Sequence, residues 1–293
     1  MAAASPLILL TGATGFVGRQ VLLALGGRDC RVRAVVREGK QNRLPRLPAI
    51  DSVVVSPDIF AERAAWWREA CRGIDTVVHV AWYAEPGHYL QSPKNRDCLK
   101  GTLRLAQGAI EARVRRFVGI GTCFEYDLSA QRLSVDSALK PVTPYAEAKA
   151  ETFKTLSEML PRHGIAFAWC RLFYLYGEGE DARRLVPYLR AQCAAGAPAE
   201  LSSGEQIRDY LDVREAGRMI AEAALGSAVG PVNICSGIPV TVRQLAERIA
   251  DEYGRRDLLR FGARADAPTD PPCVVGIRAA GSPLPSRRLV NPC

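Results

Sequence analysis

Three glycines that follow the first apolar run of the chain constrain its fold more than any other feature. The run Leu7–Thr11 predicts a buried β-strand, and the pattern Phe16–Leu25 predicts an α-helix. Between them, Gly12 allows a tight turn, Gly15 lets the backbone approach a pyrophosphate, and Gly18 lets the helix pack closely. The helix then directs its free N–H groups and the positive end of its dipole at the phosphates. Because a strand precedes the motif and a helix follows it, we expect a dinucleotide site here.

Apolar runs alternate with helical patterns through the first half of the sequence. The predicted strands are Leu7–Thr11, Arg31–Val36, Ser52–Ser56, Thr76–Val80, Arg116–Ile120 and Ile165–Arg171. The predicted helices between them are Phe16–Leu25, Ile59–Cys71, Lys94–Ala112 and Pro144–Leu160. Strands that are apolar at nearly every position are typically covered on both faces. The alternation predicts an α/β fold with a Rossmann-type, doubly wound parallel sheet and right-handed crossovers.

The pattern changes after Gly177. The later predicted elements are helix Ala182–Ala195, extended segment Ile207–Val213, a helix to about Leu225, strand Val232–Cys235 and helix Thr241–Tyr253. We expect residues 1–176 to form a dinucleotide-binding domain and residues 177–293 to form a smaller substrate-binding α/β lobe, interleaved with the first. From about Ala265 the chain is rich in Pro, Gly and Arg without periodicity, which predicts an irregular tail with a disordered end.

Composition narrows the class of protein. Nine scattered cysteines, no Cys-x-x-Cys pair and three histidines favour free thiols in a reducing compartment over a metal site. The net charge of +8 comes with dispersed arginines and no nucleic-acid motif, and anionic small substrates or an arginine-rich genome explain it equally well. No run approaches the roughly 20 apolar residues that cross a bilayer, and the start lacks a basic signal region. We therefore expect a cytoplasmic protein that binds neither nucleic acid nor membrane.

The end of the second predicted strand bears on the choice of cofactor. A chain that prefers NAD usually carries an acid there for the ribose hydroxyls. Arg37 stands there instead, and a guanidinium suits a 2′-phosphate. Three further cations lie nearby in the sequence: Arg33, Lys40 and Arg43. We expect NADP(H), with NAD(H) as the alternative if Arg37 is only a solvated loop charge. After the third strand, Asp58-Ile59 faces the adenine or, alternatively, Asp58 caps the next helix.

A tyrosine and a lysine stand four residues apart at the start of the helix that begins at Pro144. Tyr145 and Lys149 therefore share one helix face. An ammonium beside a phenol stabilises the phenolate, so Tyr145 can exchange a proton with a carbinol or carbonyl oxygen. Thr122, at the carboxyl end of the preceding strand, can hydrogen-bond the same substrate oxygen. The alternative role of Thr122 is to cap a turn.

Four motifs occur in a fixed order: TGATGFVG, HVAW, GTCFEY and YAEAK. In this order they resemble the extended short-chain dehydrogenase/reductase family. Within that family, the chain is most similar to the NAD-dependent epimerase/dehydratase proteins that act on nucleotide sugars. The resemblance covers about residues 7–255.

The resemblance implies a role for each matching residue. Tyr145 would be the general acid/base, Lys149 would bind the nicotinamide ribose and tune Tyr145, and Thr122 would be the hydroxyl partner. The implied cofactor-binding residues are Gly12, Thr14, Gly15, Phe16, Val17, Gly18, Arg37, Asp58, Ile59, Ala81, Trp82, Tyr145 and Lys149. Arg208 would meet the substrate phosphates, and Cys123 would contact the substrate.

The chain departs from the family where a dehydratase needs an acid pair. The 4,6-dehydratases place Asp-Glu after the catalytic Thr, whereas Cys123 and Phe124 follow it here. Glu125 stands one place too late unless a local bulge brings it back. Cys98 and Tyr174 replace two asparagines that are common in the family, so a substrate-phosphate contact is lost or remade.

These features favour a reductase that delivers hydride from NADPH to the 4-keto group of a nucleotide-linked 4-keto-6-deoxyhexose. The first alternative is an NAD-dependent nucleotide-sugar epimerase, which uses the same three residues. The second is a non-catalytic nucleotide-binding scaffold, against which the joint presence of Thr122, Tyr145 and Lys149 argues. The resemblance also implies a homodimer through Lys94–Ala112 and Pro144–Leu160, with a monomer as the alternative.

Overall fold

A seven-stranded sheet forms the centre of the computed structural model, which describes residues 5–267 and 270–278. Its strands are β1 (Leu7–Thr11), β2 (Arg31–Arg37), β3 (Ile50–Ser56), β4 (Thr76–His79), β5 (Arg116–Thr122), β7 (Ala166–Leu172) and β11 (Gly230–Ile234). Their order is β11-β7-β5-β4-β1-β2-β3, and every neighbouring pair is parallel. The chain winds outward from β1 in both directions, which confirms the predicted Rossmann-type, doubly wound sheet.

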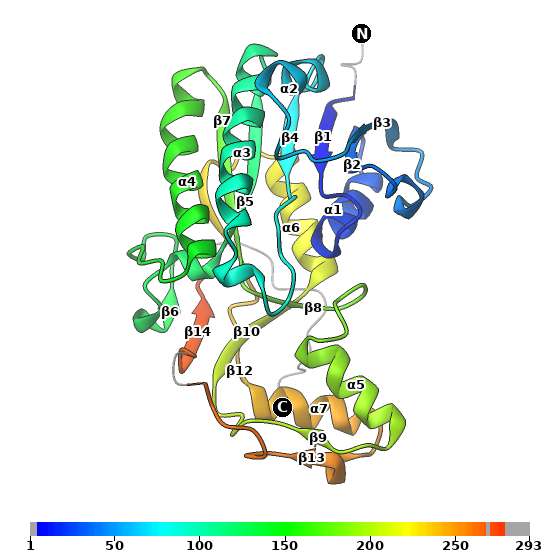
Figure 1. Ribbon diagram of the computed structural model, residues 1–293, viewed down its shortest axis with the longest axis vertical. Helices are drawn as coiled ribbons and strands as arrows, with labels where there is room; N and C mark the ends of the chain where they lie inside the picture. The colour runs from blue at the N-terminus through cyan, green and yellow to red at the C-terminus, as the bar shows by residue number, and fades with distance from the viewer. Residues whose placement is uncertain (1–4, 268–269, 279–293) are drawn as a thin grey trace.

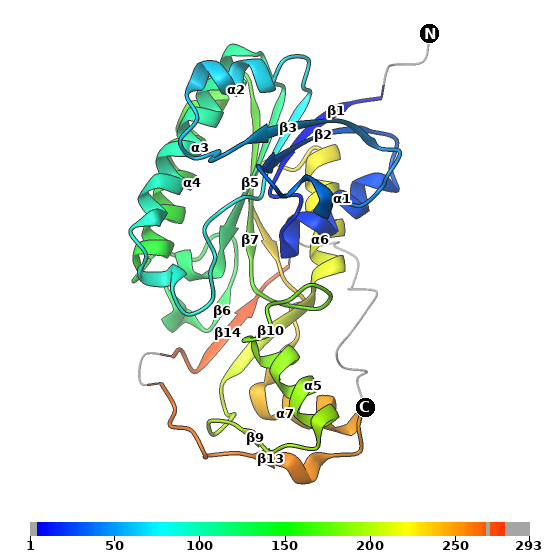
Figure 2. The same ribbon diagram turned by 45° about the vertical axis from the view of Figure 1, so that its right-hand side comes forward.

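Helices cover both faces of this sheet, as Figures 1 and 2 show. On one face lie α2 (Ala64–Ala70), α3 (Lys94–Glu111) and α4 (Pro144–Arg162). On the other face lie α1 (Phe16–Gly26) and α6 (Val213–Leu225). A separate cluster of buried apolar side chains fills each face, which explains why the strands are apolar at nearly every position. Within the part of the chain that the structure describes, no helix is long and apolar enough to cross a membrane.

A smaller lobe lies beyond the carboxyl edge of the main sheet (Figure 1). Its strands are β6 (Arg132–Leu133), β8 (Tyr174–Tyr176), β9 (Ala199–Glu200), β10 (Ile207–Asp212), β12 (Pro239–Thr241), β13 (Leu259–Arg260) and β14 (Cys273–Gly276). Its larger sheet runs β12-β10-β14-β6 with β8 beside β10, and β9 pairs separately with β13. Helices α5 (Leu185–Ala195) and α7 (Val242–Asp251) share an apolar cluster of their own. Because β7 runs almost directly into β8, the carboxyl ends of the main strands face this lobe.

Two predicted helices begin later than the sequence indicates. The helix expected over Ile59–Cys71 begins at Ala64, because the preceding residues form a turn in which the Ala61 amide donates to the Asp58 carbonyl at 3.0 Å. The helix expected from Ala182 begins at Leu185. There the Asp181 carboxylate accepts from the Arg183 amide at 3.0 Å and holds the chain in a turn.

The expected irregular tail contains a strand. β14 pairs in parallel with β10 and with β6, and it buries Val274 and Val275. A strand of four residues is too short to show periodicity, so the sequence did not predict it. The end that was expected to be disordered, residues 279–293, lies outside the described residues.

Candidate active site

The glycine-rich turn fits closely between β1, β4 and α1. Gly12 has a φ of 74°, and a Cβ there would lie 2.8 Å from the Ala81 backbone nitrogen. A Cβ on Gly18 would lie 2.0 Å from the carbonyl oxygen of Gly12. Gly15 is the N-cap of α1, and no side chain among the described residues caps that helix. The first N–H groups of α1 therefore remain available to an anion, and the turn can take a pyrophosphate.

A buried histidine, which the sequence reasoning passed over, joins the glycine turn to β4 and α3. His79 Nδ1 lies 2.8 Å from the Thr11 hydroxyl, and Nε2 lies 2.9 Å from the Thr102 hydroxyl. Thr102 donates to the Cys98 carbonyl, and the Ala81 amide donates to the Thr11 hydroxyl. Because the Thr102 hydroxyl already donates to the Cys98 carbonyl, it accepts from His79, so Nε2 carries a proton. Burial, reinforced by the charge of Lys149, lowers the pKa of His79 to about 3, so the ring is neutral at physiological pH.

The residues expected around the adenosine end are spread along the edge of β2 and β3. Arg37 ends β2 and is exposed. Arg33 faces away from it, because its guanidinium donates to the carbonyls of Ala70 and Arg72 at the end of α2. Asp58 accepts from the Phe60 amide at 3.0 Å and does not cap α2, whose N-cap is Arg63. Of the two roles proposed for Asp58, helix capping is therefore wrong.

Tyr145 lies in the first turn of α4 because the sequence around it starts a helix efficiently. Thr143 is the N-cap and accepts from the Ala146 amide at 3.2 Å, and Pro144 takes the first helical position. The ring of Tyr89 meets that of Tyr145 edge-on, with 4.8 Å between the centroids. Burial raises the pKa of Tyr145 above its usual range, Tyr89 and Glu125 add to the shift, and a hydrogen bond with Thr122 opposes it. At neutral pH Tyr145 is therefore a protonated phenol.

Lys149 projects from the same face of α4 into the interior. Its Nζ donates to the Ile120 carbonyl at 2.6 Å and lies 3.7 Å from the ring centroid of Trp82. The side chain of Lys149 is almost fully buried. Burial lowers the pKa of Lys149 to about 7, against the opposing charges of Glu125 and Cys98.

Thr122 ends β5 and begins the short 3₁₀ turn η3 (Cys123–Glu125). Its hydroxyl accepts from the Phe124 amide at 3.3 Å, and its own amide donates to Glu125 Oε1 at 2.8 Å. Thr122 thus caps this turn, which confirms the alternative role expected for it, and it also hydrogen-bonds Tyr145. The structure brings Thr122, Tyr145 and Lys149 together at the carboxyl edge of the sheet.

Glu125 is buried behind Thr122 and is held by donors on both oxygens. Trp169 Nε1 donates to both carboxylate oxygens, and Arg171 Nε donates to Oε2 at 2.7 Å. Arg171 also donates to the Tyr126 hydroxyl at 3.0 Å. No bulge brings Glu125 forward, and its contacts give it a structural role.

Of the two residues expected to contact substrate, Cys123 begins η3 and Arg208 lies in β10, whereas the dyad formed by Tyr145 and Lys149 lies on α4. Arg208 is buried, forms a 2.6 Å ion pair with Asp270, and lies 5.3 Å over the ring of Tyr174. Cys123 is buried in an apolar cluster of the smaller lobe, and burial raises the pKa of its thiol to about 12. The Arg208 guanidinium is thus held by a carboxylate, and the Cys123 thiol is buried and uncharged.

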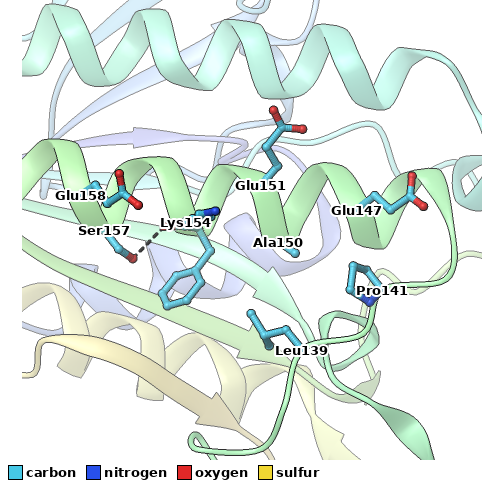
Figure 3. Close-up of a pocket in the computed structure, with 9 residues that line it drawn as sticks. Leu139, Pro141, Glu147, Ala150, Glu151, Lys154, Ser157 and Glu158 are labelled. Atoms are coloured by element: carbon cyan, nitrogen blue, oxygen red, sulfur yellow. Dashed lines mark hydrogen bonds between the residues drawn. The ribbon is translucent and has the colours of Figure 1, made fainter.

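A separate cavity of about 480 Å³ lies on the outer side of α4, as Figure 3 shows. Its lining residues are Leu139, Pro141, Glu147, Ala150, Glu151, Phe153, Lys154, Ser157 and Glu158. Neither Tyr145 nor Lys149 lines it, because they project from other positions on the helix. This cavity is therefore distinct from the candidate active site.

Known proteins resemble this chain in sequence. The model of the NAD dependent epimerase/dehydratase family matches residues 8–235. The dTDP-6-deoxy-L-talose 4-dehydrogenase (NAD(+)) of Aggregatibacter actinomycetemcomitans is 22% identical over 250 residues, which are 84% of this chain and 90% of that protein. The dTDP-4-dehydro-6-deoxy-D-allose reductase of Streptomyces bikiniensis is 24% identical over 276 residues, with 87% of this chain and 84% of that protein covered.

A solved structure shares the fold. The UDP-glucose 4-epimerase of Thermotoga maritima superposes with a TM-score of 0.81 at 20% identity, and the match covers 93% of this chain and 90% of that one. Because the family model matches most of the chain, the protein belongs to the NAD dependent epimerase/dehydratase family.

Proposed function

We propose that this protein reduces the 4-keto group of a nucleotide-linked 4-keto-6-deoxyhexose, with NADPH as the reductant. The observation that carries the proposal is the meeting of Thr122, Tyr145 and Lys149 at one edge of the sheet. The dTDP-linked 6-deoxy sugars in the names of two relatives support this class of substrate. In this proposal residues 1–176 hold the cofactor and residues 177–293 form the substrate lobe. The two parts interleave, because α6 and β11 belong to the second part of the chain but cover and extend the main sheet.

The chain has a cradle that fits a dinucleotide. Gly12, Gly15 and Gly18, with the uncapped start of α1, would hold the pyrophosphate. Ala81 and Trp82 would lie along the cofactor beside Lys149. When bound, the nicotinamide supplies a hydride to the substrate carbon.

Tyr145 acts as the proton donor in this scheme. Its raised pKa keeps the phenol protonated at neutral pH, which suits a group that must give a proton to a developing alkoxide. Thr122, already hydrogen-bonded to Tyr145, orients the same substrate oxygen. The ammonium of Lys149 stabilises the phenolate that remains after the transfer.

The surroundings of Glu125 favour a reductase over a dehydratase. Elimination of water needs a carboxyl group that can exchange protons with the sugar. Both oxygens of Glu125 accept hydrogen bonds from buried donors, and Cys123 and Phe124 supply no acid. The chain keeps the residues for hydride and proton transfer without the acid pair that elimination requires.

Arg37 supports NADPH as the reductant. Its guanidinium is exposed at the end of β2, where the ribose of the adenosine half would lie. Arg19 of α1 donates to the Arg43 carbonyl at 3.4 Å, so α1 contacts the segment that follows β2. NAD remains the cofactor named for the family and for one relative.

The test is the oxidation of NADPH with a panel of dTDP-, GDP- and CDP-linked 4-keto-6-deoxyhexoses. Stoichiometric oxidation with one sugar, lost in Tyr145→Phe and kept in the surface variant Tyr253→Phe, is the expected result. Interconversion of a nucleotide sugar without net oxidation of NADPH would contradict the reductase and favour an epimerase. Binding of NADPH without turnover of any sugar would favour a scaffold.

We also propose that α3 and α4 form the contact of a homodimer. The exposed residues of α3 include four basic ones, Lys94, Arg96, Lys100 and Arg104, beside the acids Asp97 and Glu111. The exposed residues of α4 include three acids: Glu147, Glu151 and Glu158. A two-fold axis that sets α3 of one protomer against α4 of its partner pairs these charges. Sedimentation should find a dimer that the double variant Glu151→Lys/Glu158→Lys dissociates, whereas a monomeric parent protein would refute the proposal.

A further inference from the structure

The ammonium of Lys149 lies against the face of an indole. Its Nζ is 3.7 Å from the centroid of Trp82, well inside the range of a cation–π contact. Nζ also donates a 2.6 Å hydrogen bond to the Ile120 carbonyl. The ring and the carbonyl together hold the charged group in place.

Trp82 is itself fixed in place. Its indole N–H donates to Asn95 Oδ1 at 2.9 Å, and Asn95 donates in turn to the carbonyls of Tyr89 and Ser92. Asn95 is 1% exposed, so these hydrogen bonds are shielded from water. The indole cannot turn its face from Lys149 without breaking this network.

Few charges surround Lys149 on the elements packed against it. Glu125 of η3 attracts the ammonium, but its carboxylate already pairs with Arg171 of β7. The nearby titratable groups of the other elements are His79 of β4, Tyr89 of η2 (Tyr89–Gln91), Cys98 of α3 and Tyr145 of α4. Burial raises the pKa of Cys98 to about 11 and lowers that of His79 to about 3, so both are neutral near pH 7. Among the described residues, no carboxylate lies within ion-pair distance of Lys149.

We propose that Trp82 is a positioning residue of the dyad, whose indole face holds the Lys149 ammonium against the Ile120 carbonyl and stabilises its positive charge where water is excluded. Burial, partly offset by the charges of Glu125 and Cys98, lowers the pKa of Lys149 to about 7, where the ammonium is only partly protonated near neutral pH. The quadrupole of the indole favours the protonated form of Lys149 and therefore raises the fraction of the side chain that is charged. Trp82 acts on the proton donor through Lys149 and needs no contact with the substrate.

The proposal rests on the proposed function for what the charge does, but the charge itself can be measured without cofactor or substrate. The chain has six lysines, so ¹³Cε signals of the full-length labelled protein can be resolved, and the signal missing from Lys149→Arg identifies Lys149. Trp82 is replaced site-specifically by tryptophans with one, two and three fluorines. Fluorination withdraws charge from the ring face with little change in its size.

We expect the pKa of Lys149 to fall with each added fluorine, by about one unit over the series. The same series at Trp66, which packs on Trp67 in α2, should leave the pKa of Lys149 unchanged. A constant or rising pKa at Lys149 in the Trp82 series would overturn the proposal and leave Trp82 as a space-filling residue. Trp82→Phe, with a weaker face, should give an intermediate fall, while Trp82→Leu should give the largest. Failure of the sugar panel would not alter these results, so the two proposals fail separately.

Discussion

The carboxylate of Glu125 and the guanidinium of Arg171 form a 2.7 Å ion pair in which the two side chains are 0% and 1% exposed. The pair joins the end of β5 to the end of β7, so it fixes the turn that carries Thr122. A buried charge that loses its partner keeps its full desolvation penalty. Much of the order at the candidate site therefore depends on this one pair.

Replacement of Glu125 by glutamine should strongly destabilise the fold. Glu125→Gln keeps the size of the side chain but leaves the Arg171 guanidinium without a counter-charge, at a cost of about 3–5 kcal/mol in free energy of unfolding. Urea denaturation measures the loss. The matched control is Glu205→Gln, which breaks the exposed Glu205–Arg243 pair and should cost at most about 1 kcal/mol. Equal small losses in both variants would contradict a structural role for Glu125.

The main sheet could be predicted from the sequence because each buried parallel strand is an apolar run of its own. β1, covered on both faces, begins and ends where predicted. In the smaller lobe, β10 was predicted as the extended segment Ile207–Val213. The strands β6, β9, β13 and β14 could not be predicted, because the first three have two residues each and β14 has four. Their burial comes from pairing partners far away in sequence, such as β6 with β14.

The candidate site could be predicted only where its residues share one element. The spacing of Tyr145 and Lys149 on one helix gives their common face directly. The contact of Lys149 with Trp82 depends on how the segment after β4 folds back over α4, which no spacing encodes. The pairing of Glu125 with Arg171 likewise joins residues 46 positions apart.

A second prediction concerns the stability of the protein in acid. The pKa of His79 is about 3 in the folded chain, against about 6.5 for an unperturbed histidine. Between these values the unfolded chain binds more protons, so the free energy of unfolding falls as the pH falls. The contribution of His79 to the free energy of unfolding is complete above about pH 6.5 and is lost as the pH falls towards 3. Over this range the free energy of unfolding changes by at most about 1.4 kcal/mol per pH unit.

Replacement of His79 by glutamine should remove this part of the acid dependence. Urea denaturation at several pH values should give a lower but flatter stability profile for His79→Gln between pH 3 and 6.5. His163→Gln, at an exposed position, should keep the wild-type slope. A parallel profile for His79→Gln would mean that His79 carries a proton in the folded state.

A third prediction concerns the choice of cofactor. Arg37→Ser should weaken NADP(H) binding about 10- to 100-fold, because one hydrogen bond between charged groups contributes about 1.5–3 kcal/mol. The affinity for NAD(H) should change little. Arg33→Ser is the control, since Arg33 donates to the end of α2 and should affect stability without changing preference. Calorimetric titration of the wild type and of both variants with each cofactor gives the dissociation constants. Equal losses of affinity for both cofactors in Arg37→Ser would refute a 2′-phosphate contact.

Gly18 in the first turn of α1 and Gly27 at its C-cap should respond differently to alanine. A Cβ on Gly18 would lie 2.0 Å from the Gly12 carbonyl oxygen, a backbone atom that cannot move without shifting the turn. Gly18→Ala should therefore weaken cofactor binding at least about tenfold, which corresponds to about 1.4 kcal/mol, and should also lower stability.

At Gly27 the φ is −91° and a Cβ would lie 3.8 Å from the nearest atom, the Ala24 carbonyl oxygen. Gly27→Ala should be neutral or stabilise the fold by up to about 1 kcal/mol, because it restricts the unfolded chain. Calorimetric titration with the cofactor and thermal unfolding of both variants measure the contrast. If Gly18→Ala bound cofactor as tightly as Gly27→Ala, the glycine turn would not be the pyrophosphate cradle.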